Sequence, residues 1–254
     1  MLAVILKDLY CYVSSRKYRR IQFIALCTLS LVLFIATIEF YAHRREAGAI
    51  DVGKQTYILF IIALFIVQFL VPRHAVEALD MECGYLRDDR QNAALLALTS
   101  LSDWKVLAGK LFGVVIWAMW GILLTVPLFA LSSYIGSSAP LQWMKCGVVL
   151  LVSCVFFALL GIGAALLFSS VRAKAISYGF VLLITFFPFI PSALFEAMPV
   201  LAAISPLCAF LSIFGTDPTD LWVWNIGLFS VLSVLIFPVL VKRMRFRCGI
   251  GEIR

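Results

Sequence analysis

The chain has 254 residues, of which 63% are hydrophobic and only 14% are charged, and its mean hydropathy is +1.03. This composition excludes an ordinary soluble domain, in which about half of the residues are apolar and about a quarter are charged. The net charge of +7 would suit a nucleic-acid partner, but its distribution along the chain is explained by membrane topology, so we expect no nucleic-acid binding.

We expect residues 1–20 to form an amphipathic helix that lies along the membrane surface. Apolar residues recur near helical spacing from Leu2 to Val13, and a basic cluster follows at residues 16–20. A cleavable signal is not predicted, because its positive charges would precede its apolar run. Two interpretations of this helix stay open. It is either a simple interfacial anchor or a lever that passes on movement from a cytoplasmic partner.

Residues 21–254 are expected to form one all-α, polytopic transmembrane domain. A helix needs about 20 apolar residues to cross the hydrocarbon core, and six runs without Lys or Arg in their interiors qualify. The runs do not alternate as barrel strands would. The six predicted spans are 21–42, 55–76, 106–134, 146–171, 175–195 and 221–241.

The positive charges predict the orientation. Seventeen of the 21 Lys and Arg fall in alternate segments, which include both termini and residues 73–110. The positive-inside rule therefore places these segments in the cytoplasm. The same excess of positive charge would attract anionic lipid, so the lipid bilayer is one expected partner.

Residues 77–105 form a predicted cytoplasmic segment that is more polar than the apolar spans on either side of it. Asp88, Asp89 and Arg90 precede a helix-prone apolar stretch at 93–98, and Ser102 or Asp103 could cap a new helix that continues into the third span. The apolar ridge could fill a groove on a partner, with the charges forming a rim. The alternative is an ordinary amphipathic loop helix.

The sequence indicates no chemistry carried out by this chain. It contains no P-loop motif, and Glu39 is the only acidic residue within a predicted span, so we expect no intramembrane charge cluster. Paired cysteines and converging His, Asp, Glu or Ser–Lys groups are also missing. We therefore predict no catalytic residues, no metal site and no cofactor in the chain.

In their order along the chain, these features resemble the membrane (permease) subunits of type-two ABC exporters. The resemblance departs at Gln91 and Asn92, where the family commonly has Gly-Thr, and at Ser100, where it has Pro. The outer segment 196–220 contains "ISPLCAFLSIFG" (204–215), which is similar to the family's outer re-entrant helices between spans five and six. The matching residues between spans two and three are Asp88–Arg90, Leu95, Leu96, Leu98, Thr99, Leu101, Ser102, Gly109 and Lys110.

The resemblance implies a permease subunit of an ATP-driven exporter in the cell inner (plasma) membrane. Two membrane subunits, identical or different, would pair, and each would rest on a separate ABC ATP-binding subunit that holds ATP and Mg. The cytoplasmic coupling helix would dock on that subunit. The implied contact residues are Asp88, Asp89, Arg90, Leu95, Leu96, Leu98, Thr99, Leu101 and Ser102.

Alternatives remain at this stage. Phe186, Phe187 and Phe189 could line a path for an apolar substrate or simply face lipid. The chain could also be a haem- or copper-maturation permease, or a membrane scaffold in an assembly or motility-type ABC complex without classical transport. A membrane-embedded enzyme is disfavoured, because the spans lack the converging polar groups that it would need.

Overall fold

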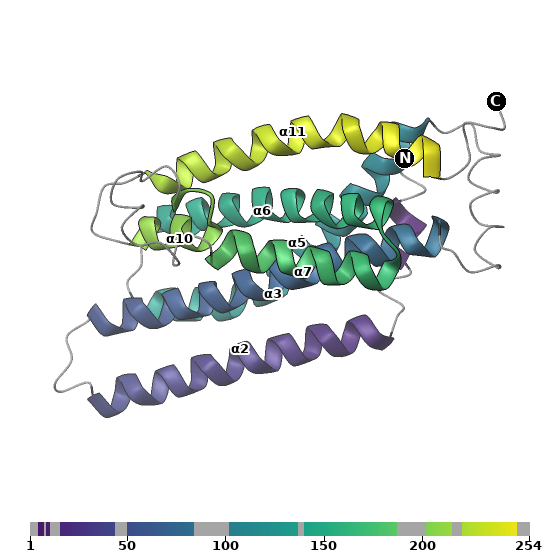
Figure 1. Cartoon of the computed structure of the whole chain (residues 1–254). Helices are drawn as coiled ribbons and strands as arrows, with labels where there is room; N and C mark the ends of the chain where they lie inside the picture. Colours follow the sequence, from purple (N-terminus) through teal and green to yellow (C-terminus); the bar gives the residue numbers. More distant parts are fainter. Residues whose placement is uncertain are drawn as a thin grey trace.

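The computed structural model describes residues 5–7, 9–10, 16–43, 50–83, 102–136, 140–186, 202–214 and 220–247. Within these ranges every regular element is a helix. The long helices run side by side along one axis, and a short helix, α10, lies at one end of the bundle (Figure 1). The helices are α2 (Arg16–His43), α3 (Ile50–Cys83), α5 (Asp103–Gly136), α6 (Pro140–Leu167), α7 (Ser170–Phe186), α10 (Pro206–Phe214) and α11 (Leu221–Arg247).

Four stretches of the described helices are long and apolar enough to cross a membrane: Ile61–Leu79, Asp103–Leu128, Leu141–Leu167 and Leu221–Met244. They correspond to the second, third, fourth and sixth predicted spans. The first predicted span lies within α2, and the fifth overlaps α7. Neither helix is among the four stretches that are long and apolar enough to cross a membrane. The chain is therefore a membrane-embedded helical protein with at least four candidate spans, and the count of six goes beyond this finding.

The outward faces of the helices are apolar, as a lipid environment requires. On α11, Val231, Val234 and Leu235 are exposed, whereas Asn225 and Phe229 of the same helix are buried. Such a helix is inverted relative to one in water, where the polar residues face out. The hydrogen bonds of each long helix satisfy its own backbone, so an apolar exterior carries no unpaired backbone groups into lipid.

Helix α3 occupies the centre of the bundle, where it packs against α2, α5, α6 and α7. It approaches α6 closely at Gly161, because a Cβ there would lie 2.8 Å from the Pro72 Cα and 2.9 Å from the Ala75 Cβ. Pro72 lies within α3, where its ring removes one hydrogen bond of the helix backbone. Gly161 thus lets α6 pack directly against the backbone of α3 at this proline.

Some boundaries differ from the sequence-based prediction. Helix α3 continues from the predicted end of the second span at residue 76 to Cys83, so residues 77–83 prolong the helix that contains this span. At the N-terminus, α2 already begins at Arg16, so residues 16–20 extend the first long helix. Ile5 is buried, and Leu9 packs against the main core. The described N-terminal residues therefore contact the bundle as well as any membrane surface.

Candidate functional site

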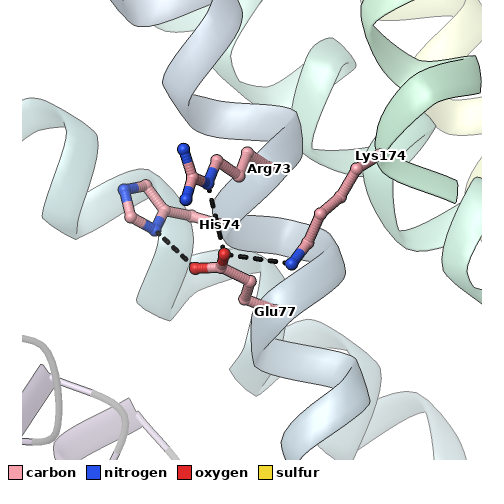
Figure 2. A network of polar contacts seen from close by, with 4 residues as sticks. All are labelled: Arg73, His74, Glu77 and Lys174. Carbon is pink, nitrogen blue, oxygen red and sulfur yellow. Dashed lines mark hydrogen bonds and ion pairs between the residues drawn. The ribbon is translucent and has the colours of Figure 1, made fainter. Parts of the chain in front are cut away.

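A cluster of charged side chains lies in α3 near its C-terminal end. Arg73 and Glu77 are four residues apart and His74 and Glu77 three apart, so both pairs are neighbours on the helix surface. All three residues lie within the apolar stretch Ile61–Leu79. The neighbouring helix α7 supplies the fourth member, Lys174 (Figure 2).

The Glu77 carboxylate is the centre of this cluster. Its Oε1 accepts a hydrogen bond from Arg73 Nε at 3.2 Å and is 3.1 Å from Lys174 Nζ, and its Oε2 is 4.0 Å from His74 Nδ1 (Figure 2). Glu77 is only 8% exposed, whereas the side chains of Arg73 and Lys174 are 32% and 30% exposed. The cluster therefore has a buried anionic centre and two cations that reach the surface.

The cluster also contacts α5 through His74. This residue is buried, and its ring meets that of Trp117 edge-on, with ring centroids 3.7 Å apart and an interplanar angle of 65°. Trp117 belongs to α5, and Lys174 belongs to α7. Fewer than two turns of α3 therefore hold one set of polar contacts that joins three helices.

This cluster was not predicted from the sequence, and it lies where α3 and α7 reach the ends of their predicted spans. Arg73 had been interpreted only as a topology signal, and Glu77 falls one residue beyond the predicted end of its span. The spacing of Arg73 and Glu77 is a signal from which the first ion pair could have been predicted. Lys174 is far away in the sequence, and no local pattern identifies it as a partner.

A second polar group links helices nearer the opposite end of the bundle. Thr185 Oγ1 donates to Gln68 Oε1 at 3.0 Å, and Ser205 Oγ donates to the Thr185 carbonyl at 2.8 Å. Asn225 Nδ2 donates to the Ala203 carbonyl at 2.7 Å. The residues just before α10 are therefore bonded to α7 and α11, and α7 is bonded in turn to α3.

Of the predicted ATPase-contact residues, only Ser102 lies among the described residues. Its carbonyl accepts the backbone N–H groups of Lys105 at 2.8 Å and Val106 at 3.2 Å, so Ser102 immediately precedes α5. Its hydroxyl is buried without a hydrogen-bond partner in the described residues, so the side-chain cap expected at Ser102 is not formed. The other contact residues, Asp88–Leu101, lie outside the described residues.

The predicted phenylalanine path is described only at Phe186. Its ring is 42% exposed and stacks on Phe65 of α3, with centroids 5.8 Å apart. Phe187 and Phe189 lie outside the described residues. A small cavity of about 60 Å³ lies elsewhere, between α2, α3 and α5, and is lined mainly by apolar side chains.

Other chemistry is limited in the part of the chain that the structure describes. No group of three or more His, Cys, Asp or Glu there could hold a metal ion. Burial raises the pKa of the Cys208 thiol in α10, and the thiolate needed for nucleophilic attack is therefore scarce at neutral pH. Compared with models of known protein families, the chain matches none, and it matches no curated protein. The Glu77 cluster is thus the most developed polar site in the described residues.

Proposed function

We propose that this chain is the membrane subunit of an ATP-driven exporter of the type-two ABC class. In this proposal it crosses the inner membrane six times with both termini in the cytoplasm. It pairs with a second membrane subunit and takes its energy from a separate ATP-binding subunit. The segment from Asp88 to Ser102 is the part that the ATP-binding subunit binds.

One observation carries the proposal. Helix α3 ends at Cys83 and α5 begins at Asp103, and these two helix ends lie at the same end of the bundle (Figure 1). The two helices pack against each other extensively. Residues 84–102 therefore join two central helices, and a force applied to this segment would act on both of them directly.

The Glu77 cluster connects the C-terminal end of α3 to the neighbouring helices α5 and α7, so that movement of α3 would be transmitted to them. Lys174 ties α7 to α3 through Glu77, and His74 contacts Trp117 of α5. A displacement of the C-terminal end of α3 would therefore be transmitted to both neighbours. Because α7 also contacts Ser205 through the Thr185 carbonyl, the same helix reaches the residues before α10. This arrangement would couple a cytoplasmic push to the far end of the protein.

The experiment that tests the proposal is co-purification. The tagged chain is extracted from membranes of cells that also express a candidate ABC ATP-binding subunit, and the bound subunit and its ATP hydrolysis are measured. We expect the two to co-purify. The double variant Asp89→Lys with Leu96→Asp is expected to abolish binding, because it reverses a charge on the rim and places a carboxylate on the apolar ridge.

The matched control makes the same two kinds of change at the other end of the bundle. Asp220→Lys lies just before α11, and Leu141→Asp replaces an exposed leucine in the first turn of α6. This control is expected to retain the ATP-binding subunit. Intact binding by the Asp89→Lys, Leu96→Asp variant would refute the proposed grip, provided that its helical circular dichroism equals that of the parent.

A further inference from the structure

The seam between α3 and α7 is built from two matching ridges. On α3, residues 65, 69, 73 and 77 recur at intervals of four and so lie along one line of the helix surface. On α7, Lys174, Tyr178 and Phe186 lie along the facing line. Three layers of contact result. Phe65 stacks on Phe186, Phe69 meets Tyr178 with centroids 5.8 Å apart, and Glu77 pairs with Lys174.

Among the described side chains, the charged layer of this seam carries more positive than negative charge. Arg73 and Lys174 are both paired with the single carboxylate of Glu77, and each leaves about a third of its side chain exposed. Arg73 contacts Glu77 through Nε, and its guanidinium carries further N–H donors on its two terminal nitrogens. One neighbouring group is the side chain of Tyr178. The surface here presents fixed cationic donors that are held in place by a buried anion.

The surface next to these cations is apolar. On α7, Leu182, Leu183 and Phe186 are exposed, and Leu182 follows Tyr178 at the same interval of four. The Phe69–Tyr178 and Phe65–Phe186 pairs continue along the seam away from the charges. A molecule with an anionic end and a long apolar tail would match both parts, with its anion on the cations and its tail along the aromatic layers.

We propose that the α3–α7 seam is a binding site for an anionic phospholipid. The lipid phosphate contacts Arg73 and Lys174, and an acyl chain lies against Phe69, Tyr178 and Leu182. Both cations contact Oε1 of Glu77, which holds them close together, and the excess positive charge supplies the complementarity. A free phosphate ion shares the headgroup chemistry, but the exposed apolar seam has no role in binding it. The site does not depend on whether the chain belongs to a transporter.

The test uses the full chain, purified in detergent and then examined by native mass spectrometry with added phosphatidylglycerol or phosphatidylcholine. The parent is expected to retain phosphatidylglycerol in preference to phosphatidylcholine. Arg73→Gln is expected to lower the apparent affinity for phosphatidylglycerol about fivefold, which is the change that about 1 kcal/mol for one basic group at an anionic lipid surface would give. Arg172→Gln is the matched control. Arg172 is an exposed arginine of α7 that lies two residues from Lys174 and therefore on another face of that helix. It is expected to bind like the parent.

Two further arms keep the result unambiguous. Lys174→Arg retains the charge and is expected to keep the preference for phosphatidylglycerol. Lys174→Gln removes the charge and is expected to reduce that preference. Thermal unfolding shows whether each variant is folded. Inorganic phosphate at the same phosphate concentration is expected not to displace the lipid. Displacement by inorganic phosphate would overturn the lipid assignment in favour of a soluble anion. An equal loss of affinity in Arg172→Gln and Arg73→Gln would overturn the site itself, because it would show attraction by overall charge.

Discussion

Lys174 of α7 and Glu77 of α3 form an ion pair of 3.1 Å between two helices that are far apart in the sequence. The carboxylate is nearly buried and also accepts a hydrogen bond from Arg73. Burying a carboxylate is costly unless it is paired and hydrogen-bonded. The position of Glu77 therefore depends on both cations, and the stability of the α3–α7 contact should depend on Glu77.

The first prediction concerns this carboxylate. Glu77→Gln leaves Arg73 and Lys174 close together without their shared anion, so we expect the free energy of unfolding to fall by about 1.5–3 kcal/mol, the range for hydrogen bonds to charged groups. Unfolding can be followed with a thiol-reactive dye, because Cys146 and Cys154 are buried in the folded bundle.

A double-mutant cycle provides the control for this prediction. Lys174→Gln alone and the pair Glu77→Gln with Lys174→Gln complete the cycle, and residues in direct contact are expected to show an interaction energy of about 0.5–3 kcal/mol. If the losses in unfolding free energy of the two single variants add up to that of the double variant, the ion pair contributes nothing to stability. The role assigned to it in linking α3 to α7 would then be wrong.

The second prediction concerns the contact between α3 and α6. In Gly161→Ala the new methyl group would meet the Pro72 carbonyl oxygen and the Ala75 side chain. The obstacle is mainly backbone, which cannot rotate away, so α6 must shift. We expect a loss of about 1–3 kcal/mol, as in other overpacked cores.

Gly147→Ala in the same helix is the matched control, because nothing lies within 4 Å of a Cβ built at that position. It should be neutral or slightly stabilising, since alanine is the better helix former. Equal thermal midpoints for the two alanine variants would show that the close approach at Pro72 does not limit the packing of these helices.

The composition and the long apolar runs were enough to predict an all-helical membrane protein. Helix α5 illustrates why, because its length follows from an apolar run that the sequence shows directly. Local signals of this kind are readable from sequence alone. The end of α3 was not predicted, because Glu77 looks too polar for a span in sequence, and its burial depends on helices from elsewhere in the chain.

The candidate site could be predicted from the sequence only in part, for the same reason. The four-residue interval between Arg73 and Glu77 is visible in the sequence, but the partner Lys174 is selected by the packing of α7 on α3. The hydrogen bond of Thr185 to Gln68 is a similar case, since neither residue has a local pattern that points to the other. Periodicity predicts which face of a helix is available, whereas tertiary packing decides which residue meets it.

The third prediction concerns this hydrogen bond. Thr185→Val preserves the shape of the side chain but removes the donor to Gln68, whose Nε2 is also buried without a hydrogen-bond partner in the described part of the chain. We expect a loss of about 1–3 kcal/mol, the cost of leaving a buried polar group unsatisfied.

Thr37→Val serves as the control for the threonine change. The Thr37 hydroxyl donates to the Leu33 carbonyl of its own helix, so its loss breaks no contact between helices. This variant should unfold within about 0.5 kcal/mol of the parent. Comparable losses in both valine variants would mean that the Thr185 bond is worth no more than a local one, and the polar link between α3 and α7 would lose its support.

The fourth prediction concerns orientation in the membrane. In a variant without its native cysteines, single cysteines replace exposed Lys105 near the start of α5 and exposed Asp220 just before α11. These positions lie at opposite ends of the bundle (Figure 1). From the distribution of Lys and Arg we expect a membrane-impermeant maleimide to label Asp220→Cys in intact cells, and to label Lys105→Cys only after the membrane is permeabilised. The reverse pattern would place residues 84–102 outside the cytoplasm, where no ATP-binding subunit could reach them, and the exporter proposal would fail even with the fold intact.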